Sequence, residues 1–432
     1  MPLAKACAVR HHGALLHPPE PLVRALPAVA IVLPAWRYLF LLPLALLSLL
    51  GCERPAPTPL DNQVYIWQRQ WLPAHQHALA ASRNDFSTLR VLAAQAHPKE
   101  GWISARIDPT MLRNDSRPLI AVVRLDGQLP TLDSVVINQH VQQLVSDWQA
   151  AGLNVQGVEI DHDCASSRLS AYREFLQQLR DKLPAGMALS ITALPAWINS
   201  PALPDLLQVV DSSVLQVHAV SRPEAGLFSP KQALQWAEAY AEQTAKPFYL
   251  ALPAYGVALL DNPDGGAPWV ESEVSLPMGG ARHELIADPD QVAALLTELK
   301  ASPPEHLQGL LWFRLPLPAD RRAWPLATLQ AVVHGQPLRS DIQLTIHQQG
   351  ALSELSLINH GNRSAALPKQ LSIAASACEA GDAIGGYRLQ QPLDNPVIFT
   401  RQTATQLAAG HSLAIGWLRC GQLDQGRSHV AP

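Results

Sequence analysis

Three acidic residues alternate along one short stretch of the chain, residues 157–164 (GVEIDHDC). Side chains of a β-strand point alternately to opposite faces, so Glu159, Asp161 and Asp163 would share one face. Carboxyl groups held this close repel one another's charge, which raises the pKa of at least one of them. A protonated carboxyl group beside an ionised one is the pair that glycoside hydrolysis requires. The stretch is therefore a candidate catalytic site.

The same acids have alternative uses. They could form a structural ion-pair network with Arg124 or Arg314, or bind Ca²⁺ or Mg²⁺ through carboxylate oxygens in a metal-dependent hydrolase or deacetylase. His162 would point to the opposite face, away from such a metal. The chain has no C-x-x-C pair and no H-E-x-x-H motif. We therefore expect no metal and no other cofactor.

Polar and aromatic residues also lie near the C-terminal ends of other strand-like runs. In a parallel barrel these ends meet at one face, where the site is found. Polar groups there would bind a substrate, and aromatic rings would form a stacking floor for a sugar. The expected binding residues are Arg124, Asp126, Gln216, His218, Tyr255, Trp312 and Arg314.

Eight strand-like runs position these residues, and helix-like runs separate most of them. Strands alternating with helices imply a parallel sheet, and eight of them imply an α/β fold closed into a (β/α)8 TIM barrel. A long loop at 257–285 follows the seventh run and would shape the cleft. The strand-like runs are 64–71, 88–96, 118–127, 155–163, 188–197, 213–220, 247–256 and 308–316, and the helix-like runs are 134–151, 168–182, 231–244, 289–300 and 321–334.

The pattern changes after Pro337. Runs at 341–347, 352–359 and 371–375 alternate polar and apolar residues between turns, which predicts a small antiparallel β module. We expect the barrel at 63–337 and this β-sandwich-like module at 338–432. Cys378 and Cys420 both lie in the module and are the expected disulfide, which leaves Cys164 free.

The N-terminal segment resembles the leader of a bacterial lipoprotein. An apolar run at 38–50 suits a signal peptide, and Leu49-Leu50-Gly51-Cys52 resembles a lipobox, with lipidation on Cys52. An ordinary secretory signal or a buried apolar segment is the alternative. Residues 1–52 would be the cleaved leader and 53–62, with three prolines, a tether. Glu53 follows the cysteine in place of the aspartate that retains lipoproteins at the inner membrane, which favours the outer membrane.

Composition narrows the class of protein. The chain has 432 residues, of which 48% are hydrophobic, so it can bury a large core. Its net charge of −4 shows no excess of basic residues of the kind that binds phosphate backbones, so we expect no nucleic-acid partner.

Several segments resemble known families. The acidic strand, residues 246–256 (KPFYLALPAYG) and residues 309–315 (GLLWFRL) are similar to strands four, seven and eight of glycoside hydrolase family 18. Residues 64–71 (VYIWQRQW) and 157–164 more closely resemble the bacterial family called domain of unknown function 3142. The family-18 resemblance implies Asp163 as the general acid, Asp161 as the carboxylate that orients the substrate, Glu159 as its support, and Tyr255 and Trp312 as subsite walls.

The chain departs from the family-18 pattern in three places. Its terminal acid is Asp in place of Glu, the first motif Asp is missing, and strand six reads Gln-Val-His. We therefore expect a lipid-anchored, periplasm-facing, glycoside-hydrolase-like protein that acts on or binds an envelope or extracellular polysaccharide. The alternative is a non-catalytic carbohydrate-binding or envelope-assembly lipoprotein on a degenerate barrel, so the sequence leaves enzymatic activity open.

Overall fold

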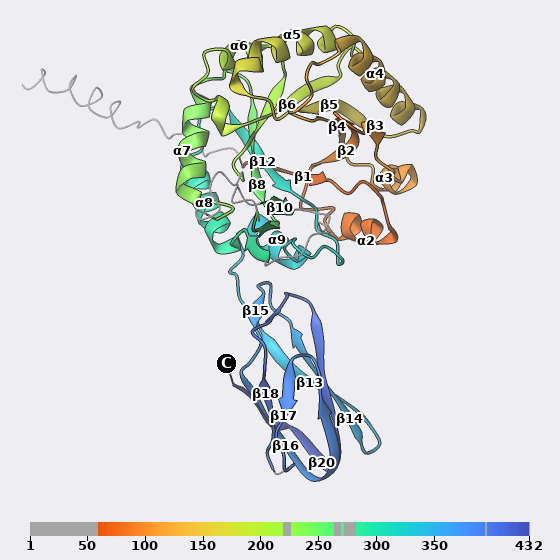
Figure 1. Cartoon of the computed structure of the whole chain (residues 1–432), viewed down its shortest axis with the longest axis vertical. Helices are drawn as coiled ribbons and strands as arrows, with labels where there is room; N and C mark the ends of the chain where they lie inside the picture. The colour runs from red at the N-terminus through yellow and green to blue at the C-terminus, as the bar shows by residue number, and fades with distance from the viewer. Residues whose placement is uncertain (1–58, 219–225, 263–268, 272–281, 394, 432) are drawn as a thin grey trace, which may run out of the picture. The chain divides into compact units, whose positions relative to one another are not determined.

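A closed ring of parallel strands forms the first part of the computed structural model, which describes residues 59–218, 226–262, 269–271, 282–393 and 395–431 (Figure 1). The strand order is β1-β12-β8-β7-β6-β5-β4-β2, and β1 also pairs with β2, which closes the barrel. The ring consists of β1 (Asp61–Ile66), β2 (Thr88–His97), β4 (Leu119–Leu125), β5 (Val155–Asp161), β6 (Ala188–Ala193), β7 (Ser212–Gln216), β8 (Phe248–Pro253) and β12 (Leu307–Phe313). A short strand, β3 (Gly101–Ser104), pairs with β2 in an antiparallel arrangement.

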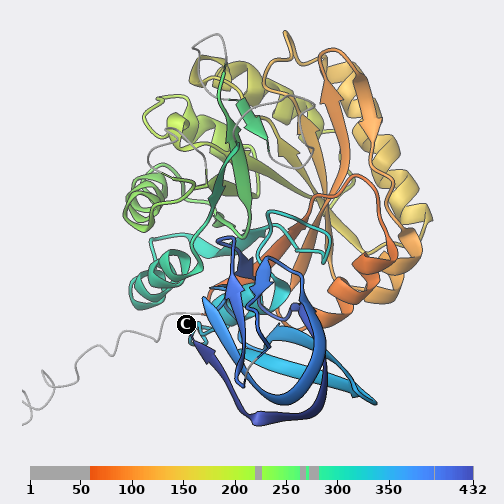
Figure 2. The ribbon, with the colours of Figure 1, turned by 60° about the horizontal axis from the view of Figure 1, so that its bottom comes forward.

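Helices surround the ring of strands, as Figures 1 and 2 show. The outward side chains of the strands, such as Val158 and Ile160 of β5, are buried in the main apolar core. Aspartate or serine side chains cap several helix N-termini by accepting backbone N–H bonds, as Asp133 and Asp288 do. The helices are α2 (Pro73–Ala81), α3 (Pro109–Asp115), α4 (Ser134–Ala150), α5 (Leu169–Arg180), α6 (Leu203–Gln208), α7 (Pro230–Ala241), α8 (Pro289–Ala301) and α9 (Leu326–Val333).

The expected fold class, a TIM barrel followed by an antiparallel β module, is confirmed. Each of the eight predicted strands overlaps one strand of the ring. The sequence patterns missed α2, α3 and α6, which have nine, seven and six residues. Helices this short show too few turns for a clear apolar period.

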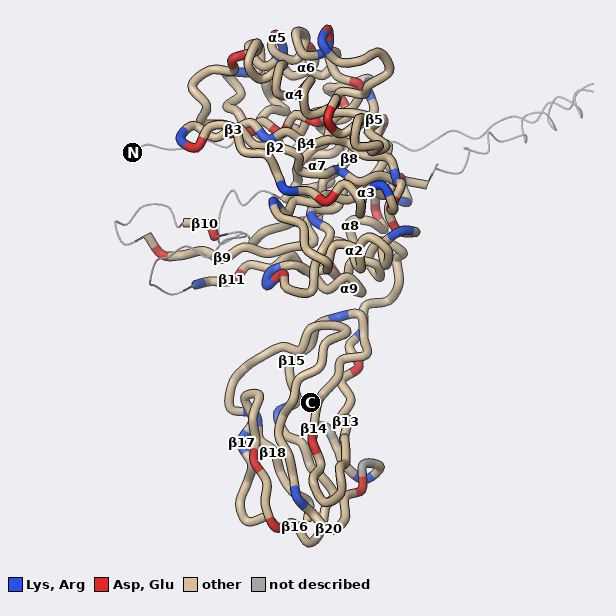
Figure 3. Tube along the Cα trace, turned by 90° about the vertical axis from the view of Figure 1, so that its right-hand side faces the viewer, with Lys and Arg blue, Asp and Glu red and all other residues tan. Residues whose placement is uncertain are grey.

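The expectation of a long loop at 257–285 was wrong for most of the residues of this segment that the structure describes. This segment contributes to a three-stranded antiparallel sheet of β9 (Gly256–Leu260), β10 (Trp269–Glu271) and β11 (Arg282–Ile286). Figure 3 shows these strands projecting beyond the barrel on the side where β3 lies. Backbone pairing therefore holds the described part of this segment together.

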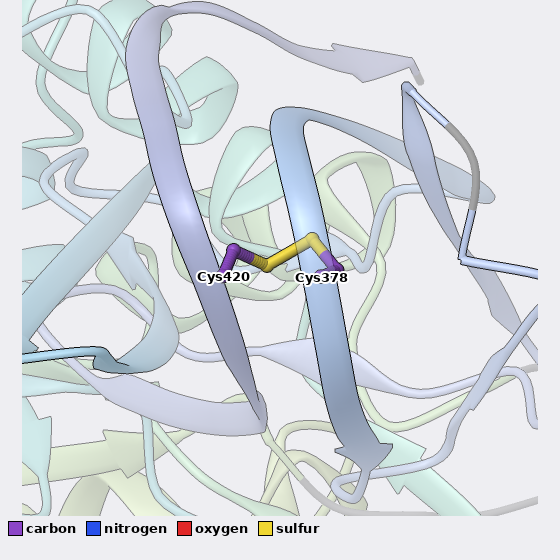
Figure 4. Close-up of a disulfide and its surroundings, with 2 residues drawn as sticks. All are labelled: Cys378 and Cys420. Carbon is purple, nitrogen blue, oxygen red and sulfur yellow. A yellow bond between two sulfur atoms is a disulfide. The ribbon is translucent and has the colours of Figure 1, made fainter.

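The C-terminal module is built from antiparallel β-strands. Its main sheet is antiparallel, with the order β13-β14-β20-β16-β18-β17, and a second pairing joins β15 to β19. A disulfide links Cys378 and Cys420, which face each other on β16 and β20 (Figure 4). The strands are β13 (Ile342–Gln349), β14 (Leu352–Asn359), β15 (Ala365–Ala366), β16 (Gln370–Ala383), β17 (Tyr387–Leu389), β18 (Val397–Arg401), β19 (Gln406–Leu407) and β20 (Ser412–Ala431).

The predicted leader at 1–52, with Cys52, lies outside the described residues, as does most of the predicted tether. Among the helices that the structure does describe, none has the length and apolar character needed to cross a membrane.

Candidate functional site

The three acids of β5 and its C-terminal extension lie at different depths of the barrel. Glu159 is fully buried and Asp161 nearly so, whereas the side chain of Asp163 is 36% exposed. Val158 and Ile160 between them belong to the outer core, so the acids alternate with residues that pack on the helices. The acidic series therefore rises from the centre of the barrel toward the C-terminal ends of the strands.

Glu159 is held by a saturated network at the centre of the barrel. The buried Arg90 guanidinium forms an ion pair with its carboxylate, and the Tyr65 hydroxyl donates to it at 2.6 Å. The Ser190 hydroxyl donates to the same carboxylate at 3.4 Å. Burial raises the pKa of Glu159, while Arg90 and Tyr65 oppose that shift. A carboxylate with these partners stabilises the barrel centre and has no free face for a substrate.

Asp161 lines the cavity above this network and accepts hydrogen bonds from side chains of three other strands. Thr192 Oγ1 donates at 2.7 Å and Gln216 Nε2 at 3.4 Å, while Arg124 Nη1 lies 3.5 Å away. These donors fix the orientation of the carboxylate, because they approach it from β6, β7 and β4.

Asp163 shares two partners with Asp161. Gln216 Nε2 lies 3.4 Å from an oxygen of each carboxyl group, and the Arg124 guanidinium lies 3.6 Å from Asp163. Because one nitrogen reaches both oxygens, the two oxygens are separated by at most twice that distance. Partial burial, followed by the charge of Asp161, raises the pKa of Asp163 to about 7. The pair therefore offers one readily protonated carboxyl group beside another carboxylate.

A cavity of about 640 Å³ opens beside this pair. Its size falls within the range of small-molecule sites, and its lining mixes aromatic rings with charged groups. Gly256, Val257 and Val270 of the β9–β11 sheet contribute to the lining.

Four rings on the cavity lining form an aromatic wall, defined as Tyr65, Trp67, Tyr255 and Phe313. The centroid of Phe313 lies 5.2 Å from that of Trp67 and 5.1 Å from that of Tyr255, both in edge-on contacts. Tyr65 and Trp67 are buried, so the half-buried Tyr255 and Phe313 present the apolar surface that suits the C–H face of a sugar.

His218 completes the wall. Its ring stacks on Phe313 with a centroid separation of 5.4 Å, and its Nδ1 lies 3.1 Å from the Tyr255 hydroxyl. Burial lowers the pKa of His218 to about 4, so the imidazole is neutral near pH 7. A neutral imidazole can position Tyr255 without adding charge to the cavity.

The structure corrects the expected position of Trp312. Its side chain is fully buried in the outer core, its Nε1 donates to Asn62 Oδ1 at 3.0 Å, and it does not line the cavity. The next residue, Phe313, lines the cavity where Trp312 was expected. The reason is that Leu311 and Phe313 are the residues of β12 whose side chains point into the barrel. Arg314 does line the cavity and donates to Asp320 at 3.1 Å.

The structure brings most of the predicted site residues to one cavity. Glu159, Asp163 and Trp312 are not among its lining residues, although Asp163 contacts two residues that are. Asp126 lies 4.0 Å from His97, another lining residue. The predicted residues that line the cavity are Arg124, Asp126, Asp161, Gln216, His218, Tyr255 and Arg314.

Sequence reasoning missed Arg90, Thr192, Tyr65, Trp67 and Phe313. Period-two alternation along the first strand-like run would have paired Tyr65 with Trp67 on one face. Nothing in the sequence linked Arg90 to Glu159, which lies 69 positions away. Within the described ranges, no group of three or more His, Cys, Asp or Glu residues is arranged to hold a metal ion.

Fold and site together define a TIM barrel with a carboxyl pair and an aromatic wall at the C-terminal ends of its strands. Residues 115–318 match the model of the family described as domain of unknown function (DUF3142), which confirms the resemblance found in the sequence. Residues 342–421 match a second family, domain of unknown function (DUF8456). No curated protein matches the chain.

Similar solved structures include the spore cortex-lytic enzyme SleL of Bacillus cereus, with 14% identity and a TM-score of 0.49 over 64% of this chain and 74% of that chain. A chitinase of Chromobacterium violaceum has 14% identity and a TM-score of 0.44 over 64% and 98%. The family-18 chitinase ChiB of Flavobacterium johnsoniae has 14% identity and a TM-score of 0.41 over 59% and 88%. At these values the likeness carries no argument about the activity of this chain.

Proposed function

We propose that the barrel binds a glycan along the aromatic wall and hydrolyses it with the Asp161–Asp163 pair. The observation that supports this proposal most directly is the shared Gln216 nitrogen, which holds the two carboxyl groups together beside the cavity. Asp163, with a pKa of about 7, would supply the proton, and Asp161 would supply the negative charge.

The reaction follows from these roles. Asp163 donates its proton to the glycosidic oxygen as the bond to the anomeric carbon breaks, and an Asp161 oxygen forms a bond to that carbon. A water molecule then displaces Asp161, while Asp163 takes up the proton of the water. A separation of at most twice 3.4 Å includes the roughly 5–5.5 Å of retaining enzymes and excludes most of the roughly 6.5–9.5 Å range of inverting enzymes, which supports this double displacement. The anomeric configuration of the product is expected to be retained.

Replacing Asp163 by Asn tests this assignment. Loss of the proton donor is expected to lower kcat by at least about 100-fold on a glycan that the wild type cleaves. Wild-type kcat should also fall as the pH rises above about 7, because Asp163 then loses its proton. Glu174→Gln, a neutralised exposed acid on α5, is the matched control and should retain full activity. Unchanged turnover in Asp163→Asn would refute the assignment.

A second candidate function is sugar binding without catalysis. The observation that favours it is Arg124, whose guanidinium lies within 3.6 Å of both carboxyl groups and neutralises part of their charge. This alternative predicts saturable binding of an oligosaccharide with no product after long incubation. Release of a reducing end by the wild type, absent in Asp163→Asn, would exclude it.

We also propose that the mature protein is attached to the bacterial cell envelope by lipid on Cys52 and faces the periplasm. This proposal is based on Leu49-Leu50-Gly51-Cys52 after an apolar run, with Glu53 favouring the outer membrane. Expression of Cys52→Ser in a Gram-negative host should move the protein from the membrane fraction to another fraction. Recovery of that variant in the membrane fraction at the wild-type level would contradict lipid attachment.

A further inference from the structure

Two exposed arginines stand on the rim of the cavity. Arg69 follows β1 and Arg321 follows β12, and both line the cavity. Because β1 and β12 are paired neighbours in the barrel, the loops that follow them leave the ring side by side. The two residues therefore belong to adjacent parts of the rim.

A side-chain bridge fixes these two loops to each other. Gln68 Nε2 donates to the Leu315 carbonyl oxygen at 3.2 Å and to Asp320 Oδ2 at 3.3 Å. The Leu315 amide donates in turn to the Tyr65 carbonyl oxygen at 2.8 Å. Arg69 and Arg321 immediately follow the bridged residues Gln68 and Asp320, so the rim presents them from a braced backbone.

The other arginines of the cavity already have acidic partners. Arg124 contacts the carboxyl pair, Arg314 contacts Asp320, and Arg322 contacts Glu271 and Glu284. By contrast, neither Arg69 nor Arg321 makes an ion pair with any residue in the described part of the chain. The charge of Arg321 does lower the pKa of Glu284, but both arginines are exposed and neither is taken up by an ion pair among the described residues, so they can receive an acidic ligand.

We infer that this rim binds the carboxylate of an acidic sugar unit, so that the glycan taken by the cavity contains uronate. The inference rests on the proposed glycan-binding function and names its substrate class. Guanidinium groups recognise planar carboxylates by paired hydrogen bonds, and the half-buried Phe313 on the same cavity offers a ring for the sugar face. The uronate unit occupies the rim because its charge would be repelled beside Asp161 and Asp163.

Binding of matched oligosaccharides tests this inference. The mature protein is titrated calorimetrically with hexasaccharides of hyaluronan and of polygalacturonate, each beside its carboxyl-reduced, neutral counterpart. At least one acidic member should bind about tenfold or more tightly than its neutral counterpart, since hydrogen bonds to charged groups add this much affinity. A keratan sulfate hexasaccharide, which carries sulfate but no uronate, shows whether sulfate can replace the carboxylate, and tighter binding of this sulfated sugar than of every uronate sugar would overturn the carboxylate assignment.

Variants connect the binding to the rim. The double variant Arg69→Gln/Arg321→Gln should lose the preference for the acidic member. Arg106→Gln should keep it, because Arg106 is exposed and its amide donates to the Arg69 carbonyl oxygen, yet it does not line the cavity. Equal affinity for both members of every pair, no binding by any acidic probe, or an unaffected double variant overturns the inference.

The outcomes separate this inference from the proposed function. If the protein cleaves a neutral glycan and shows no preference for uronate, the proposed hydrolase activity is supported and the uronate-binding rim is refuted. If the protein binds a uronate glycan through Arg69 and Arg321 but does not cleave it, the uronate-binding rim is supported and the proposed hydrolase activity is refuted.

Discussion

The Asp163 carboxyl group has a raised pKa that should be measurable without any substrate. Its pKa of about 7 in the folded protein exceeds the value of about 3.9 expected in the unfolded chain. The folded state therefore binds the proton more tightly, and this contribution to stability is complete below about pH 4 and is lost as the pH rises through about 7. Asp163→Asn should remove that part of the pH dependence.

Urea unfolding between pH 4 and pH 8 measures this effect. The free energy of unfolding of the wild type should decline relative to that of Asp163→Asn across this range, and Glu174→Gln should decline with the wild type. Parallel curves for the wild type and Asp163→Asn would show that the pKa of Asp163 is not raised by folding.

Arg90 and Glu159 form the buried ion pair at the centre of the barrel. Arg90→Met would leave the Glu159 charge buried without its partner, which is expected to lower the free energy of unfolding by about 3–5 kcal/mol. Adding Glu159→Gln should recover part of this loss, because no charge is then left buried. Urea unfolding of the single and double variants measures both effects.

The matched control is Arg173→Met, which breaks the solvent-exposed pair of Arg173 with Asp205. Exposed pairs of this kind contribute about 0–1 kcal/mol. If Arg90→Met cost no more than this control, the buried pair would not be a central stabilising contact.

Strand phase explains which site residues could be read from the sequence. Strand β5 has one acidic and one apolar face, so the placement of Glu159 and Asp161 inside the barrel followed directly from alternation. Strand β12 is apolar on both faces, as parallel barrel strands are. Alternation alone therefore could not tell whether Trp312 or Phe313 points into the barrel. The choice depends on the register with β8, where Phe313 lies opposite Pro253.

Strand length and the separation of contacting residues along the chain decided which other features could be predicted. The eight strands were identifiable because each is a distinct apolar run bounded by turns or helices. The β9–β11 sheet was missed because its strands have three to five residues and pair only with each other. Contacts such as that of Arg90 with Glu159 join strands that are not adjacent in the barrel, and no local pattern encodes them.

The β9–β11 sheet is tied to the rest of the barrel through Arg322. This guanidinium donates to Glu271 of β10 at 2.6 Å and to Glu284 of β11 at 2.6 Å. Arg322→Met should loosen the sheet by about 3 kcal/mol, because Glu271 is fully buried and loses a partner. Hydrogen exchange of peptides covering 256–260 and 282–286 should accelerate, while exchange in the barrel strands stays unchanged.

Arg106→Met is the control for the sheet, since Arg106 is an exposed arginine that makes no ion pair with described residues. Its exchange pattern should equal that of the wild type. Equal protection of the sheet in both variants would show that the Arg322 ion pairs do not brace it.

At the scale of the whole chain, the barrel and the C-terminal module have separate apolar cores that share no residue. The change of pattern after Pro337 predicted this division, because period-two alternation replaces the alternation of strands with helices. Pairing of β16 with β20 accounts for the proximity of Cys378 and Cys420, which the sequence placed only in the same module.

The disulfide should therefore stabilise the module alone. It joins residues 42 positions apart, and closing a loop of this length in the unfolded chain contributes about 4 kcal/mol. In scanning calorimetry, the double variant Cys378→Ala/Cys420→Ala should lower the transition temperature of the module and leave that of the barrel unchanged. Cys164→Ala, which removes the buried free thiol of the barrel, controls for loss of a cysteine as such. A common shift of both transitions in the double variant would mean that the two cores unfold as one cooperative unit.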